Sequence, residues 1–156
     1  MQPFFRGGDM VWSYFPYTEA PDVHAAARHA AVLVGAFSAI EATRMLGRPV
    51  PAYGAAVAVY TSSQVRKFGN SIPVGVIQVP YDRAKRNNNN SPFFIDTRVR
   101  AWLPIDKRFF PDLDSSDHGV ITSIDAGLFR RVQEEYARVN QRAQEQIVNV
   151  GPLRPR

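Results

Sequence analysis

Two long stretches of the chain carry apolar residues at three- and four-residue intervals. The first spans residues 21–46, with Pro21 in its first turn, where the missing N–H costs nothing, and Gly47 after its end. The second spans residues 123–150, begins at a serine suited to cap a helix and ends before Gly151. Because this spacing places the apolar residues on one helix face, the pattern predicts a long helix in each stretch.

Three stretches between these helices have the composition and alternation of β-strands: residues 55–62, 72–81 and 93–103. A Gly-Asn turn signal at residues 69–70 predicts that the first two form a hairpin, and two prolines in the second favour an edge strand. In the third, apolar residues alternate with Asp, Arg and Trp, which predicts one buried face and one polar, basic face. The predicted fold class is therefore α+β: a small antiparallel β-sheet with a long hairpin, packed against an N-terminal and a C-terminal α-helix.

Residues 1–17 are rich in aromatic side chains, but proline and glycine interrupt them and no helical or strand period is visible. Such a segment either docks onto a partner or folds back over the domain, and we predict an arm that serves assembly. The rest of the chain is predicted to form a single α+β domain, residues 18–150, followed by a short basic tail, residues 151–156. The residues expected to make the contacts of the arm are Phe4, Phe5, Trp12, Tyr14 and Phe15.

Composition narrows the class of protein. A chain of 156 residues and 17.5 kDa fits one domain, and its 45% hydrophobic and 21% charged content is typical of a globular fold. The absence of cysteine excludes disulfide scaffolds, thiolate metal sites and cysteine nucleophiles. No apolar stretch reaches the roughly 18 residues of a membrane-spanning helix, and no secretory signal is visible, so we expect no membrane contact.

Positive charge is concentrated in the middle of the chain. The net charge is +5, yet residues 60–108 carry nine basic and three acidic residues, whereas residues 109–129 carry four Asp and no Lys or Arg. Exposed cations of this kind bind phosphates or an acidic neighbouring subunit, and they also occur on ordinary solvated surfaces. The residues predicted to contact a partner or a polyanion are Arg66, Lys67, Arg83, Lys85, Arg86, Arg98 and Arg100.

Catalytic and metal-binding motifs are absent from the sequence, which has no Gly-x-Ser-x-Gly, His-Glu-x-x-His, Walker A or Gly-x-Gly-x-x-Gly pattern. Residues 112–118 hold three Asp and His118, but the EF-hand spacing fails, because Asp117 replaces its glycine and Ser123 its final glutamate. His24 and His29 do not share a helix face and are expected at a surface or interface. We therefore predict no catalytic residue, no cofactor and no metal, with a loose divalent-cation site at residues 112–118 left open.

The order of elements and the block at residues 51–60, PAYGAAVAVY, resemble the tail-terminator and related neck proteins of long-tailed phages. In that family an N-terminal helix leads through a loop into a similar valine-alternating strand and hairpin, a pattern matched here over residues 21–81. After the hairpin, where the family usually has a helix, this chain has a basic, Asn-rich loop and a third strand. The resemblance implies a ring subunit that caps the tail tube or joins it to the head, in a virion assembled in the host cytoplasm. It also implies partners: further copies of the chain, other structural proteins, and DNA passing through a channel.

Two classes of function follow from these patterns. The first is a non-enzymatic structural subunit of a phage virion neck or tail. The alternative is a small α+β enzyme or ligand-binding domain with a site around Asp117 and His118, and with Glu41 as a further candidate. The mass of the protein in solution separates them, because a stable ring supports the first and a ligand-stabilised monomer supports the second.

Overall fold

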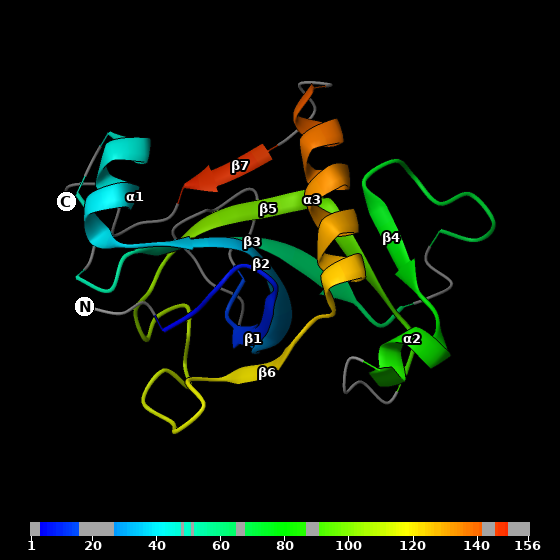
Figure 1. Ribbon diagram of the computed structural model, residues 1–156, viewed down its shortest axis with the longest axis horizontal. Coiled ribbons are helices and arrows are strands. Elements are labelled where there is room, and N and C mark those ends of the chain that lie inside the picture. The colour runs from blue at the N-terminus through cyan, green and yellow to red at the C-terminus, as the bar shows by residue number, and fades with distance from the viewer. Residues whose placement is uncertain are drawn as a thin grey trace.

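The computed structural model describes residues 4–15, 27–47, 49–50, 52–64, 68–86, 91–141 and 146–149. They form an α+β fold in which six antiparallel strands make a curled sheet, a half-barrel, with one internal and one C-terminal helix (Figure 1). A six-residue helix and a seventh strand complete it. In chain order the elements are β1 (Asp9–Ser13), β2 (His29–Phe37), α1 (Ala39–Leu46), β3 (Ala55–Ser62), β4 (Val76–Val79), α2 (Tyr81–Arg86), β5 (Phe93–Pro104), β6 (Val120–Ser123), α3 (Ala126–Gln141) and β7 (Gln146–Asn149).

The strand order in the sheet is β4-β5-β3-β2-β1-β6, and every neighbouring pair on this path is antiparallel. The long strand β5 pairs with β3 along one side. Along its other side it pairs with β4 over its N-terminal part and, in parallel, with β7 over its C-terminal part. β5 therefore connects segments from the middle and the end of the chain.

A bulge in β5 reverses which face of the sheet its side chains occupy. Two successive β3 residues, Val59 and Tyr60, lie opposite Arg100 and Asp96, so residues 97–99 are extra on β5. Because an odd number of residues is inserted into a period of two, the alternation changes face at this point. Odd-numbered positions of β5 pack toward α3 before the bulge and on the opposite face after it.

Both faces of the sheet are buried, each under a different cover. Neighbouring residues of β1, β2 and β3 alternate between two clusters, as expected for a strand with two covered faces. The cluster under α2 and α3 consists of Met10, Val32, Val59, Ile77, Val79, Ala84, Phe93, Ile95, Ile124, Leu128 and Val132. The cluster on the other face is covered by the N-terminal segment and the connection after β5, and its larger members are Phe5, Val11, Phe15, Leu33, Leu103, Ile105, Phe109, Phe110 and Leu113.

The helix predicted over residues 21–46 is wrong for most of its length. Residues 29–37 form β2, only residues 39–46 form α1, and residues 21–26 lie outside the described part of the chain. A strand covered on both faces reads as a continuous apolar run, and such a run is easily mistaken for a helical stripe. The true start of the helix is a capping box, in which Ser38 and Glu41 bind each other's backbone N–H groups.

The predicted hairpin is also wrong, although its first strand is confirmed as β3. The second strand is shorter than predicted, since β4 covers residues 76–79 only. β3 and β4 do not pair with each other, because β5 lies between them in the sheet. The strand predicted at residues 93–103 is confirmed as β5, but its predicted polar face is not, because the bulge turns Arg100 toward α3 and both faces are buried.

The C-terminal helix is confirmed as α3, but it ends earlier than predicted. It closes at Gln141, and residues 146–149 form β7 instead of continuing the helix. Residues 142–145 and the basic tail, 151–156, lie outside the described residues.

The separate N-terminal arm is a further correction. Residues 9–13 form β1, which lies between β2 and β6 inside the sheet. Phe5 and Phe15 belong to the hydrophobic core, while Phe4, Trp12 and Tyr14 are half-buried. This segment is part of the domain, because its backbone completes the sheet and its aromatic side chains fill one core; residues 1–3 and 16–17 lie outside the described residues.

Candidate functional site

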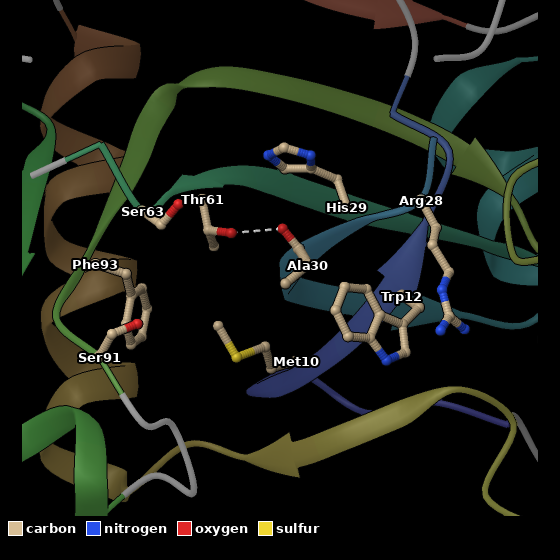
Figure 2. Close-up of a pocket in the computed structure, with 9 residues that line it drawn as sticks. All are labelled: Met10, Trp12, Arg28, His29, Ala30, Thr61, Ser63, Ser91 and Phe93. Carbon is tan, nitrogen blue, oxygen red and sulfur yellow. Dashed lines mark hydrogen bonds between the residues drawn. The ribbon is translucent and has the colours of Figure 1, made fainter. Parts of the chain in front are cut away.

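A pocket of about 230 Å³ opens where β1, β2 and β3 meet the start of β5. Figure 2 shows Trp12 and Arg28 on one side of it and Ser63, Ser91 and Phe93 on the other. One wall is fixed by the Thr61 hydroxyl, which donates a 2.6 Å hydrogen bond to the Ala30 carbonyl of the neighbouring strand. The lining residues are Met10, Trp12, Arg28, His29, Ala30, Thr61, Ser63, Ser91 and Phe93.

Arg28 is held at the rim of this pocket by two contacts. Its Nη1 donates to the Asp112 carboxylate at 2.6 Å, and its guanidinium carbon lies 4.8 Å from the centre of the Trp12 ring. The side chains of Arg28 and Asp112 are 51% and 31% exposed, so solvent screens the ion pair and it adds little to stability. The contacts instead restrict the guanidinium to one place beside the pocket.

His29 lies above the pocket and is positioned by stacking. Its ring is nearly parallel to that of Tyr60, with the centroids 4.7 Å apart. Tyr60 in turn meets Phe15 of the core edge-on at 5.6 Å. The imidazole is therefore oriented by the core beneath it. His24, the other histidine of the predicted helix, lies outside the described residues.

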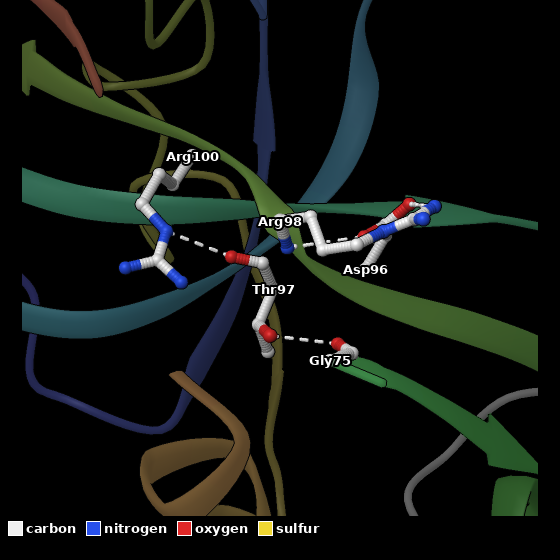
Figure 3. Close-up of polar contacts among 5 residues, drawn as sticks. All are labelled: Gly75, Asp96, Thr97, Arg98 and Arg100. Carbon is white, nitrogen blue, oxygen red and sulfur yellow. Dashed lines mark hydrogen bonds and ion pairs between the residues drawn. The ribbon is translucent and has the colours of Figure 1, made fainter. Parts of the chain in front are cut away.

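The two arginines predicted on the polar face of β5 make contacts within their own chain (Figure 3). Arg100 is 1% exposed, its Nε donates to the Thr97 carbonyl at 2.8 Å, and its guanidinium carbon lies 3.6 Å from the Tyr136 ring centre on α3. Arg98 donates to both carboxylate oxygens of Asp96 at 2.9 Å, a hydrogen-bonded pair that raises the pKa of Arg98. Arg100 is buried within its own chain, and the charge of Arg98 is paired with that of Asp96.

The remaining predicted cations divide into two groups. Arg66 and Lys67 lie outside the described residues. Arg83, Lys85 and Arg86 lie on the short helix α2, in a stretch expected from the sequence to be a basic, Asn-rich loop, and Lys85 is exposed there. The structure thus brings none of the described members of this set to the pocket.

Asp117 and His118 of the acidic loop make their hydrogen bonds to other residues of the same loop. Asp117 Oδ1 accepts hydrogen bonds from the Ser115 hydroxyl at 2.8 Å and the Gly119 N–H at 3.0 Å, and these bonds lower the pKa of Asp117. His118 Nδ1 lies 2.8 Å from the Leu113 carbonyl, with the backbone of His118 in the left-handed region at φ 57°. Such contacts are typical of tight turns. Glu41, the further candidate, accepts a hydrogen bond from the Ser38 N–H in the N-terminal cap of α1. Within the described part of the chain, no three acidic or histidine side chains are grouped to hold a metal ion.

No protein-family model matches this chain, and no curated protein matches it. Among the helices that the structure describes, none is long and apolar enough to cross a membrane.

Proposed function

We propose that this protein is a non-enzymatic structural subunit that assembles with other protein chains. We further propose that its setting is the neck or tail of a phage virion, as part of a ring that joins or caps the tail tube. The observation that carries the proposal is the exposed apolar surface of α1.

α1 lies at the end of the sheet away from α3 and is covered by little of the fold (Figure 1). Of its eight residues only Ala42 is buried, whereas the side chains of Ile40 and Met45 are exposed, at 74% and 56%. Tyr53, in the connection that follows, is 40% exposed and meets the ring of Phe4 edge-on at 4.7 Å. Single exposed apolar residues are ordinary, but two on one short helix, with an exposed tyrosine in the next connection, support a contact with another chain. Ile40 and Met45 are five residues apart and point about 140° apart around the helix, so we propose that such a contact encloses α1 from more than one side.

Of the features that carried the resemblance to neck proteins, the helix–loop–strand order remains, whereas β3 and β4 do not form the predicted hairpin. α1 still leads through a loop into the valine-alternating strand β3, as the helix of that family does. The helix has two turns instead of the seven that residues 21–46 would allow, because residues 29–37 are a strand. The helix–loop–strand unit supports the proposal, and it places the apolar surface of α1 next to the segment that carries the resemblance.

The experiment is a measurement of mass in solution by light scattering over a range of protein concentrations. We expect the wild-type chain to form a species whose mass is a multiple of 17.5 kDa, and electron microscopy of that species to show a ring. The double variant Ile40→Glu, Met45→Glu should lose the assembly without a change in melting temperature. Thr43→Glu, at an exposed position of the same helix, is the matched control and should retain it.

A wild-type protein that remains at 17.5 kDa at every concentration would contradict the ring. Assembly that survives in the double variant would show that α1 is not the contact surface.

A further inference from the structure

The pocket beside Trp12 combines an apolar interior with one cationic side chain at its rim. Met10 and Phe93, two of its apolar lining residues, are 1% and 5% exposed and belong to the core beneath α3. Among the described residues that line it, Arg28 alone carries a formal charge and none is acidic. Pockets with an apolar body and a few polar groups at one end are typical binding sites for amphipathic small molecules.

The guanidinium of Arg28 retains binding capacity beyond its ion pair. Asp112 accepts from Nη1, and a guanidinium carries five N–H donors in a planar fork, so further donors can serve a second anion. Stacking on Trp12 holds the fork in place, which lowers the conformational entropy lost when a ligand binds. The Ser63 and Ser91 hydroxyls across the pocket add groups that can donate to the same ligand (Figure 2).

The volume limits the size of the ligand. At about 230 Å³ the pocket is smaller than the roughly 300–1,000 Å³ of sites for drug-sized ligands, so its occupant has one ring or a short chain. The apolar lining residues suit the ring or chain of such a ligand, and Arg28 at the rim suits a negatively charged group at its end.

We propose that this pocket binds a small organic anion, an apolar ring or short chain that ends in a carboxylate or a phosphate, with Arg28 as the anion-binding residue. The proposal goes beyond the assembly role, because the pocket lies between strands at a different place in the fold from α1.

Titration of the 156-residue chain, followed by NMR, tests the proposal directly. The chain has two tryptophans, Trp12 and Trp102, so its indole N–H signals are assigned with a Trp102→Phe variant. The probes are benzoate, phenyl phosphate and, as the neutral isostere, benzamide. We expect a saturable shift of the Trp12 indole signal with at least one of the two anions, and the stronger of them identifies the preferred acidic group.

Arg28→Gln should weaken binding of that anion at least tenfold while the melting temperature stays unchanged, because the side chain is half exposed. Arg108→Gln is the matched control: Arg108 also pairs with an aspartate and lies 5.7 Å from an aromatic ring centre, but it does not line the pocket. This variant should bind like the wild type. A Trp12 signal that does not respond to either anion, equal binding of benzamide, or undiminished binding by Arg28→Gln would each overturn the proposal.

Discussion

The two main helices have similar amphipathic sequences but different surroundings. α3 buries Leu128, Val132 and Val139 against the sheet, whereas α1 buries Ala42 alone and leaves Ile40 exposed. An amphipathic pattern therefore predicts that a helix forms, but not how much of its apolar side the same chain covers. The helix with the uncovered side is the one we propose to contact another chain.

Hydrogen bonds also distinguish the two helices. α3 is tied to the sheet, because Glu135 accepts from the Gly75 N–H at 3.0 Å and the Tyr136 carbonyl accepts from Arg100 at 3.2 Å. The capping bonds of α1 are local: its N-terminus is closed by Ser38 and its C-terminus by Gly47. We expect α3 to unfold only with the whole domain, and α1 to open by itself.

The strongest test of the buried helix is Val132→Asp. The substitution places an unpaired carboxylate in the core beneath α3 and should lower the free energy of unfolding by about 3–5 kcal/mol. Denaturant titration measures the loss, and Glu134→Ala, on the exposed side of the same helix, should change the value by less than about 0.5 kcal/mol. Equal melting of the two variants would show that the packing side of α3 is assigned wrongly.

A smaller effect is expected at Glu135, which links α3 to the turn before β4. Glu135→Ala leaves the buried Gly75 N–H without its acceptor and should cost about 1–3 kcal/mol of unfolding free energy. Glu135→Gln keeps an acceptor oxygen and should recover most of the loss. If both variants are as stable as the wild type, this hydrogen bond does not contribute to the attachment of α3.

Ser38→Ala should weaken α1 by about 1 kcal/mol, because it removes the side-chain acceptor of the helix N-terminus. Since α1 buries one residue, we expect faster hydrogen exchange in the α1 amides with little change in the global melting temperature. A fall in global stability equal to that in α1 would mean that the two helices unfold together.

The smallest effect is expected from Ile40→Ser. The side chain is 74% exposed, so the free energy of unfolding should change by less than about 0.5 kcal/mol in the monomer. Denaturant titration at low protein concentration measures it. A clear loss of stability there would show that Ile40 packs within its own chain, and the comparison between the two helices would fail.

Part of the fold could be predicted because some elements carry their own signal. β3 and β5 are rich in β-branched residues with a period of two, and the stripe of α3 persists over several turns. The capping box Ser38–Glu41 was also visible in the sequence, inside the stretch predicted as one helix. Used as a start signal, it would have placed the helix correctly and left residues 29–37 as a strand.

The candidate site could be predicted less well, because its residues come from four separated parts of the chain. The sequence predicts Trp12 as an assembly contact and His29 as a surface or interface group, and it gives no reason to single out Arg28. Arg98 and Arg100 were predicted to contact a partner because they alternate with apolar residues along the strand. A bulge of three residues changes the face on which that alternation places the side chains. A pocket formed by pairing strands has no local spacing that could reveal it.

The sequence by itself determined the α+β class, the strands at residues 55–62 and 93–103, and the final helix, because these depend on periodicity within one segment. Only the tertiary structure decided that β5 lies between β3 and β4, that the N-terminal segment is an interior strand, and that Arg100 is buried against Tyr136. Strand order, bulges and burial depend on contacts between residues far apart in the chain. A local pattern can limit those contacts but cannot choose among them.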